Sequence, residues 1–152
     1  FEVLSIRLQT QYSNNIRNNF GFLNWTWPET MHTRDKWFTQ KGRTVFKEVI
    51  PMAAKMLSQH LADENIAVTD LRRMWLHQAN KNMNDLIAYK ILGRDATLEE
   101  APLILDRFGN TASAGTVICF DQYHADMASG DYGLLSSFGA GYSIGSVIVK
   151  RL

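Results

Sequence analysis

Cysteine is scarce in this 152-residue chain, and so is any excess of charge of one sign. The single cysteine, Cys119, cannot form a disulfide within the chain, and no group of Cys and His residues has the spacing of zinc ligands. These absences favour a reducing compartment, so we expect a cytoplasmic protein without a metal site. The formal net charge of +1 provides no overall attraction to nucleic acid or to an anionic membrane, and neither is an expected partner.

Long apolar runs are missing as well. Those present, such as residues 145–149, are far shorter than the roughly 20 apolar residues that a membrane-spanning helix needs. Hydrophobic residues still make up 45% of the chain, enough to build a buried core in one domain spanning residues 1–152. The chain begins with Phe1 and shows no signal-peptide pattern, so we expect it to be part of a longer protein that supplies further active-site residues.

The spacing of apolar residues predicts the secondary structure. Alternation and short apolar runs predict strands at residues 1–11, 74–76, 103–105, 132–138 and 142–150, the last two forming a hairpin. Helical spacing predicts helices at residues 45–62, at 81–92 between the N-cap Asn80 and Gly93, and at 113–129, the last buried on most sides. Residues 12–41 are rich in asparagine and aromatic residues, and we expect them to form a long structured loop.

This order of strands and helices indicates an α/β domain with a mostly parallel sheet and one antiparallel element at its end. Functional residues of such sheets gather at the carboxyl ends of the strands. His77, Asn110 and Phe138 all fall at or just after the ends of predicted strands. We therefore expect them to meet at one edge of the sheet.

His77 and Asn110 are the candidate catalytic residues. His77 stands just before the N-terminus of a predicted helix, a position that disfavours the charged imidazolium. A neutral imidazole can donate one hydrogen bond to a developing oxyanion, and the amide of Asn110 carries donors that could converge on the same atom. The alternatives that stay open are a satisfied buried histidine and an asparagine that only builds a turn.

Three other possible functional motifs do not fit the sequence around them. Cys119 lies in an apolar helical segment, which is typical of an inert buried cysteine rather than a thiolate nucleophile. Residues 112–115 resemble part of a serine nucleophile elbow, but Thr111 replaces its first glycine. The glycines of the final hairpin lack the spacing of a dinucleotide site and lead into a strand rather than a helix.

Four blocks of the sequence resemble the β-ketoacyl-acyl-carrier-protein synthase III family of condensing enzymes. In chain order they are residues 42–46 (GRTVF), 75–80 (WLHQAN), 105–111 (LDRFGNT) and 137–142 (SFGAGY). Two further strings, residues 83–87 and 143–147, look closest to the branch that uses medium-chain primers, similar to β-ketodecanoyl synthases. The resemblance implies the C-terminal half of a thiolase-like fold, with a five-stranded mixed sheet and helices on both faces.

The resemblance also implies a reaction, a decarboxylating Claisen condensation in fatty-acid synthesis. In such acyltransferases a cysteine of the N-terminal half is acylated by acyl-CoA. Malonyl-acyl-carrier-protein then loses carbon dioxide and attacks the acyl group. Both substrates are phosphopantetheine thioesters and no bound cofactor is implied. The expected partners are the N-terminal half, acyl carrier protein and a second copy in a homodimer.

Individual residues match the family's catalytic positions. His77 and Asn110 match the pair that donates hydrogen bonds to the malonyl thioester carbonyl and stabilises the enolate. Phe138 matches the aromatic residue beside the nucleophile. The backbone N–H of Ala140 matches an oxyanion donor of the acylation step, a role that alanine fills only with a negative φ.

The substrate-binding positions match less completely. Gly42 and Asn80 match positions that line the pantetheine arm, but Arg43 replaces the asparagine that often follows the glycine. Asn82 replaces a basic residue that docks acyl carrier protein in the family, and the adjacent Lys81 is the candidate substitute. The wall of the acyl tunnel is expected to include Trp25, Trp27 and Trp37.

The nucleophilic cysteine of the family has no counterpart in this chain. Cys119 matches no catalytic position, so the chain alone is predicted to be inactive. Two other functions stay open. One is a related condensing enzyme of the alkylresorcinol, chalcone or hydroxymethylglutaryl-CoA synthase type, and the other is a non-catalytic thiolase-like module that binds carrier protein.

Overall fold

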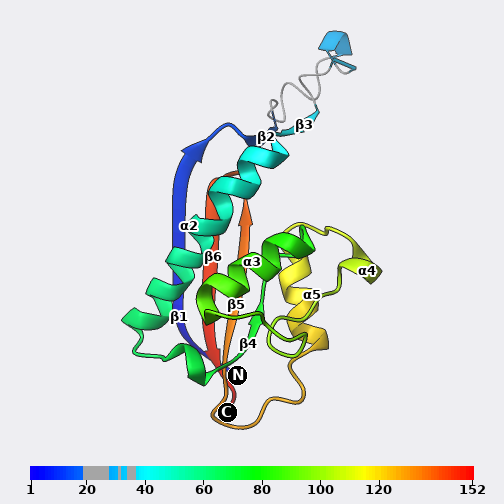
Figure 1. Cartoon of the computed structure of the whole chain (residues 1–152). Coiled ribbons are helices and arrows are strands. Elements are labelled where there is room, and N and C mark those ends of the chain that lie inside the picture. Colours follow the sequence, from blue (N-terminus) through cyan, green and yellow to red (C-terminus); the bar gives the residue numbers. More distant parts are fainter. Residues whose placement is uncertain (19–27, 31, 34–36) are drawn as a thin grey trace.

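The computed structural model describes residues 1–18, 28–30, 32–33 and 37–152 and contains a β-sheet packed between helices (Figure 1). Within these residues the main sheet has the strand order β1-β6-β5-β4, and β2 pairs with β3 in a separate small sheet. The strands are β1 (Glu2–Ser13), β2 (Ile16–Asn18), β3 (Phe38–Gln40), β4 (Leu71–Trp75), β5 (Tyr132–Gly139) and β6 (Gly141–Lys150). The helical elements are η1 (Pro28–Thr30), α2 (Gly42–Asp63), η3 (Val68–Asp70), α3 (Lys81–Leu92), α4 (Leu105–Phe108) and α5 (Ala114–Gln122).

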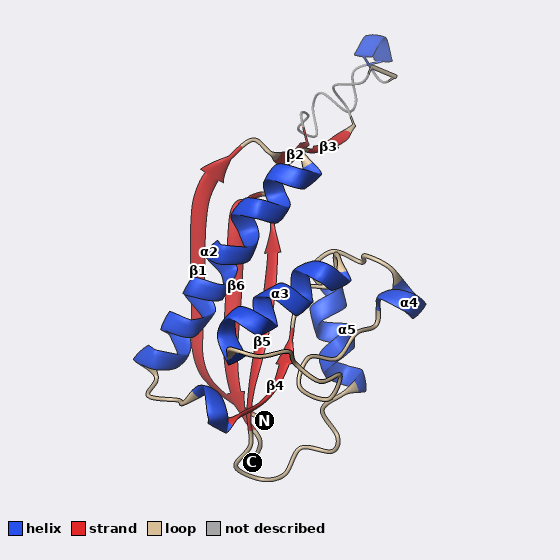
Figure 2. Cartoon of the chain, in the orientation of Figure 1, coloured by secondary structure: helices blue, strands red, loops and turns tan. Residues whose placement is uncertain are grey.

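Figure 2 distinguishes the strands of the main sheet from the helices that lie beside it. Alternation along the strands creates a hydrophobic core on each face of this sheet. Leu134 and Ile148 belong to the larger core, which residues of α2 and α3 complete. Their chain neighbours Leu135 and Val147 point the other way, into the smaller core around Trp75 and α5. The expected α/β class with helices on both faces is therefore confirmed.

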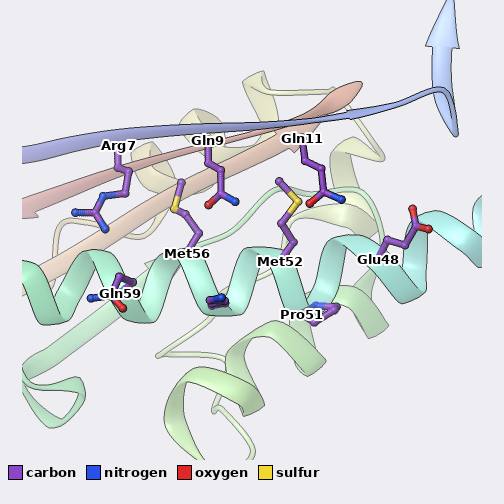
Figure 3. Close-up of a pocket in the computed structure, with 9 residues that line it drawn as sticks. Arg7, Gln9, Gln11, Glu48, Pro51, Met52, Met56 and Gln59 are labelled. Atoms are coloured by element: carbon purple, nitrogen blue, oxygen red, sulfur yellow. The ribbon is translucent and has the colours of Figure 1, made fainter.

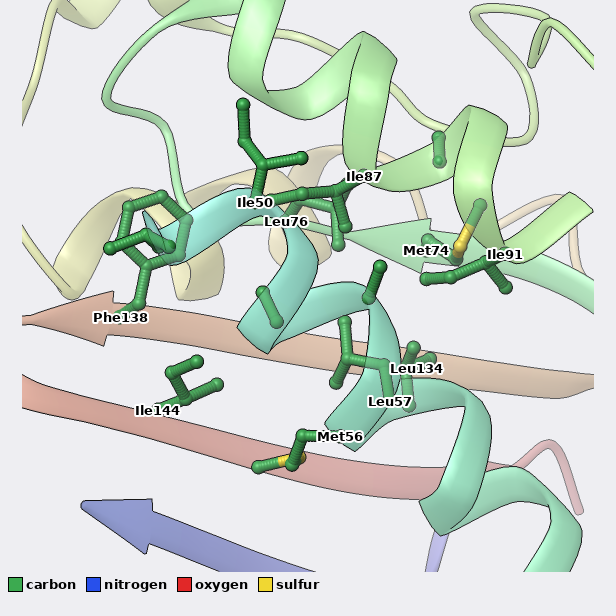
Figure 4. Close-up of a cluster of buried hydrophobic side chains, with 14 of the residues drawn as sticks. Ile50, Met56, Leu57, Met74, Leu76, Ile87, Ile91, Leu134, Phe138 and Ile144 are labelled. Carbon is green, nitrogen blue, oxygen red and sulfur yellow. The ribbon is translucent and has the colours of Figure 1, made fainter. Parts of the chain in front are cut away.

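Helix α2 forms because its apolar residues recur at helical spacing and cover the sheet. Val49 and Leu57 have no exposed surface, and Leu57 shares the larger core with Leu134 of β5 (Figure 4). Pro51 lies within the helix but on its exposed side. The helix predicted at residues 45–62 is thus confirmed, and it begins slightly earlier, at Gly42.

Strand β1 and helix α2 run side by side along a partly polar groove of about 420 Å³ (Figure 3). Gln9 and Gln11 reach from the strand toward the helix, and Met52 and Met56 reach from the helix toward the strand. Flexible methionine side chains fill irregular spaces well, which suits a surface where a helix meets polar strand residues.

A buried histidine joins α2 to two strands. His60 has no exposed surface, and its Nδ1 lies 2.8 Å from Ser146 Oγ of β6 while its Nε2 lies 3.0 Å from Ser5 Oγ of β1. Burial, followed by the positive charge of Arg7, lowers the pKa of His60. Both ring nitrogens are therefore satisfied by hydroxyl groups in the neutral state.

The main sheet has four strands in the described residues rather than the expected five, because the strand predicted at residues 103–105 does not form. Pro102 has no N–H to donate to a neighbouring strand. The side chain of Gln78 accepts a hydrogen bond from the N–H of Ile104 at 3.0 Å. This N–H is therefore not available to a neighbouring strand either. The chain then turns directly into α4.

The prediction of a mostly parallel sheet was wrong. Only β4 and β5 pair in parallel, whereas β6 is antiparallel to both β5 and β1 in the described structure. Sequence patterns do not reveal that β1 lies beside the last strand of the chain instead of beside β4.

Two local predictions also need correction. The helix predicted at residues 113–129 spans only Ala114–Gln122, and Val117 on it is 61% exposed, so it is not buried on most sides. In the predicted loop at 12–41, β1 continues to Ser13 and the β2–β3 pair forms. Trp25 and Trp27 lie outside the described residues, whereas Trp37 is described and 59% exposed.

We predict that Leu57→Ala lowers the free energy of unfolding of the full-length protein by about 3 kcal/mol, because it removes buried methyl groups and leaves a cavity in the larger core. Denaturant-induced unfolding measures this change. Leu86→Ala on α3 is the matched control. Leu86 is 40% exposed, so this variant should lose far less free energy of unfolding. Equal losses in the two variants would contradict this account of the core.

Candidate active site

A cavity of about 230 Å³ lies at the end of the sheet where β4 and β5 terminate. It contains four of the predicted site residues: His77, Asn110, Phe138 and Ala140. The remaining wall comes from β2 and β3, the first turns of α2 and α3, and the segments on either side of these residues: Ile16, Phe38, Gln40, Val45, Ala79, Met83, Ala112, Ser113 and Gly139. His77 and Phe138 therefore meet at one edge as expected, whereas Asn110 reaches that edge after α4 and not at the end of a strand.

His77 reaches this edge because β4 ends at Trp75 and α3 begins at Lys81. Asn80 is the N-cap of α3, as predicted, and its Oδ1 accepts a hydrogen bond from the N–H of Met83 at 3.3 Å. Gly93 ends the helix in the left-handed conformation with φ of 72°. The short connection between strand and helix leaves His77 few alternative positions.

The ring of His77 is held on two sides. Its Nδ1 lies 3.1 Å from Ser137 Oγ, and its ring meets that of Phe138 edge to face with centroids 4.5 Å apart. The residue is 7% exposed. Burial lowers the pKa of His77 to about 4, so the imidazole is neutral at pH 7. The predicted neutral state therefore agrees with the structure, and its cause is burial.

Asn110 builds a turn, one of the two roles that the sequence left open, and its role as a donor stays a prediction. Its Oδ1 accepts a hydrogen bond from the N–H of Ala112 at 3.0 Å, which closes a turn of the Asx type. Ala112 has a positive φ of 54°, and Gly109 on the other side has φ of 62°. Because the turn uses only the amide oxygen, the Nδ2 hydrogens remain donors for a ligand in the cavity that Asn110 lines.

Gln78 is a structural part of the site that the sequence patterns did not reveal. It has no exposed surface, and its Nε2 donates to the carbonyls of Leu76 at 2.9 Å and Pro102 at 3.4 Å. Its Oε1 accepts the N–H of Ile104 at 3.0 Å. Gln78 thus joins the loop that carries His77 to the segment that leads to Asn110.

Phe138 and Ala140 occupy the end of the β5–β6 hairpin. Phe138 is 7% exposed and belongs to the larger core as well as to the cavity wall. Among the described non-glycine residues only Asn65 and Ala112 have positive φ. Ala140 therefore meets the backbone condition for an oxyanion donor, although the role itself stays a prediction.

The other predicted binding residues lie around the cavity rather than in its wall. Gly42 begins α2 and lines an adjacent apolar hollow of about 340 Å³ with Arg43, Phe46 and Lys47. Lys81, at the start of α3, pairs with Asp85 one turn later at 2.6 Å, and both side chains are exposed. The roles of Gly42, Asn80 and Lys81 stay predictions.

Cys119 is not a nucleophile in this arrangement. It is fully buried, its Sγ lies 3.4 Å from the carbonyl of Pro102, and burial raises the pKa of the thiol to about 12. In the part of the chain that the structure describes, no cluster of His, Cys, Asp and Glu could hold a metal ion. No helix of the same part is long and apolar enough to cross a membrane.

Solved structures of condensing enzymes share this fold. The 3-oxoacyl-acyl-carrier-protein synthase III of Aquifex aeolicus superposes with a TM-score of 0.78 at 18% identity, covering 98% of this chain and 44% of the enzyme. The corresponding enzyme of Thermus thermophilus gives a TM-score of 0.80 at 22% identity, covering 99% of this chain and 46% of the enzyme. The fold is thus that of the C-terminal half of such enzymes, as the sequence blocks implied.

Curated relatives are similar in sequence over most of the chain. It is 57% identical over 151 residues to β-ketodecanoyl-acyl-carrier-protein synthase of Pseudomonas aeruginosa, which covers 99% of this chain and 43% of that relative. It is 30% identical to β-ketoacyl-acyl-carrier-protein synthase III of Porphyromonas gingivalis, over 80% of this chain and 36% of that relative. The chain therefore spans less than half the length of these relatives.

The match to a protein family is direct. The model of the 3-oxoacyl-acyl-carrier-protein synthase III C-terminal family matches residues 61–151, more than half of the chain. This chain belongs to that family. The family resemblance stated from the four sequence blocks is confirmed.

We predict that protonation of His77 destabilises the folded protein in acid. The folded pKa of about 4 lies below the ordinary value of 6.5, so the unfolded state takes up the proton first as the pH falls. The stability that neutral His77 contributes is complete above pH 6.5 and is lost on the way to pH 4. The shift corresponds to about 3 kcal/mol.

Denaturant-induced unfolding between pH 7 and pH 4 measures this loss. His77→Asn should flatten the dependence of stability on pH, and replacement of the exposed His32 by Asn should not. The same pH dependence in wild type and His77→Asn would show that His77 is not buried as a neutral ring.

Proposed function

We propose that this chain is the C-terminal half of an acyl-CoA-primed β-ketoacyl-acyl-carrier-protein synthase of fatty-acid synthesis. The observation that carries the proposal is the presence of two neutral donor groups, the imidazole of His77 and the amide of Asn110, in one cavity. Membership of the synthase III C-terminal family supports the same reaction. A cofactor is not part of this proposal, because both thioester substrates carry their own reactive groups.

The donor pair suits the decarboxylation step. As the bond between the malonyl α-carbon and its carboxylate breaks, carbon dioxide leaves and the electron pair moves onto the thioester oxygen as an enolate. Hydrogen bonds from His77 Nε2 and Asn110 Nδ2 would stabilise that oxygen. The enolate carbon then attacks the acyl thioester held on a cysteine, which releases the cysteine thiolate and forms the β-keto product.

The acylated cysteine would come from an N-terminal half that packs against the exposed apolar face of the sheet. Ile6 and Leu8 of β1 are 72% and 74% exposed, and Val117 of α5 is 61% exposed. These side chains and the partly buried Leu135 and Val147 line one hollow of about 380 Å³. An apolar surface of this kind favours a partner in the complete enzyme, and we propose that the chain alone is inactive.

Further proposals concern the substrates and surroundings of the complete enzyme. The relative with 57% identity is a β-ketodecanoyl synthase, which supports a medium-chain acyl primer. Ile16 and Phe38 line the cavity and are better candidates for a tunnel wall than Trp37, which does not line it. Gly42 and Asn80 would contact the pantetheine arm, and the backbone N–H of Ala140 would bind the oxyanion of acylation. The complete enzyme would be a cytoplasmic homodimer.

Related condensing reactions remain a second candidate function, since alkylresorcinol, chalcone and hydroxymethylglutaryl-CoA synthases use similar donors. No observation on the described residues favours them, and none favours a non-catalytic binding module. Products formed from acyl-CoA primers of different length by the full-length protein would separate these functions.

We predict that His77→Ala and Asn110→Ala each lower the rate of malonyl decarboxylation in the full-length protein by about 10²–10³-fold, the usual effect of losing one oxyanion donor. Acylation of the cysteine by acyl-CoA should stay measurable. Release of carbon dioxide from malonyl-acyl-carrier-protein and mass spectrometry of the acylated cysteine provide the two readouts. His32→Ala is the control, and undiminished decarboxylation in both site variants would overturn the assignment.

We also predict that Lys81→Glu raises KM for malonyl-acyl-carrier-protein several-fold while KM for acyl-CoA stays unchanged. The ammonium lies at the exposed start of α3, although its pairing with Asp85 lowers the positive charge it presents. Lys90→Glu near the other end of the same helix is the matched control. The effect should shrink at high salt, and identical KM values for the two variants would remove Lys81 from the docking surface.

A further inference from the structure

We propose that Ser137 is a positioning residue that fixes the tautomer of His77, donating its hydroxyl proton to Nδ1 so that the ring proton stays on Nε2. The inference deepens the proposed function and rests on it, because it concerns the same donor site. Neither the sequence blocks nor the match to the family assigns a role to this serine.

The first observation is the register between two strands. β4 and β5 are parallel and Trp75 pairs with Leu135, so continuing by two residues on each strand brings His77 to the level of Ser137. The hydroxyl Oγ lies 3.1 Å from Nδ1. Phe138, the next residue, contacts the ring edge to face. Two successive residues of β5 therefore hold the imidazole in one orientation.

The second observation is the separation between the two ring nitrogens. His77 lines the catalytic cavity, whereas Ser137 lies on the other side of the strand, in the hollow lined by Leu135 and Val147. With Nδ1 directed to Ser137, Nε2 is the ring nitrogen left to serve the cavity. A neutral imidazole has one donor and one acceptor nitrogen. Whether Nδ1 is protonated therefore determines whether Nε2 accepts or donates a hydrogen bond.

The third observation is the chemistry of the group beside Nδ1. A carboxylate or a backbone carbonyl only accepts hydrogen bonds and would force the proton onto Nδ1, which would leave Nε2 as an acceptor that repels an enolate oxygen. A serine hydroxyl can donate to a bare Nδ1, which is the tautomer that keeps the ring proton on Nε2. The Ser137 hydroxyl is the polar side-chain group that the described structure places within hydrogen-bond distance of Nδ1.

Nuclear magnetic resonance of the full-length protein with ¹⁵N-labelled histidine tests the tautomer without any assay of activity. The long-range ¹H–¹⁵N spectrum of the His77 ring should show a protonated Nε2 and a bare Nδ1 at pH 7. In Ser137→Ala the ring should show a mixture of both tautomers, and Ser137→Thr should restore the wild-type pattern. A proton on Nδ1 in the wild-type protein would overturn the proposal.

The rate of decarboxylation provides the second readout. Ser137→Ala should lower kcat about tenfold, the effect expected when the transition state loses stabilisation equal to about one hydrogen bond. KM for malonyl-acyl-carrier-protein should stay unchanged. Ser137→Thr should recover most of the rate. Gly145 faces Ser137 across the strands, and open space around its Cα leaves room for the added methyl group.

Ser136→Ala is the matched control, because the Ser136 hydroxyl donates to the carbonyl of Gly145 and has no hydrogen bond to His77. A wild-type kcat in Ser137→Ala, or an equal loss in Ser136→Ala, would overturn the proposal even if His77→Ala is inactive. If the wild-type protein shows no decarboxylation at all, the proposed function fails, and the ring spectrum alone then decides whether Ser137 sets the tautomer.

Discussion

The parallel pairing of β4 with β5 is the constraint on which the candidate site depends. It places His77 beside two successive residues of β5, one of which meets the ring edge to face while the other lies at its Nδ1. The N-cap of α3 and the buried amide of Gln78 then limit how far the loop after β4 can move. A slip of one residue in this register would remove Ser137 from the level of His77 and bring there a neighbour whose side chain faces the other side of the sheet.

The sequence predicted those features that local chemistry encodes. Helix α3 lies between Asn80 and Gly93 as expected, because an N-cap asparagine and a left-handed glycine mark helix ends independently of the rest of the fold. The meeting of His77 and Phe138 in one cavity could also be predicted, since each follows or ends a strand, whereas Asn110 reaches the cavity after α4 and not from the strand that was expected there. The enolate-stabilising role proposed for His77 and Asn110 came from the family resemblance rather than from spacing.

Non-local contacts decided what the sequence could not. The segment at 103–105 has the apolar character of a strand, but Gln78, twenty-six residues earlier, binds one of its backbone donors. Ile16 and Phe38 line the cavity because β2 pairs with β3. No periodic pattern in the sequence predicts this pairing. The sequence did not indicate a role for Ser137, because serine is common in strands. Its contact with His77 depends on the register between β4 and β5.

The neutral state of His77 has a consequence for how the site discriminates between reactant and intermediate. Neither a neutral imidazole nor the amide of Asn110 carries a net charge, so the pair would offer no ion pair to the carboxylate of the proposed malonyl substrate. A cationic site would hold that carboxylate firmly and oppose its departure. In the proposed reaction, dipoles aimed at the thioester oxygen would gain strength only as negative charge accumulates there, so the site would bind the enolate more tightly than its precursor.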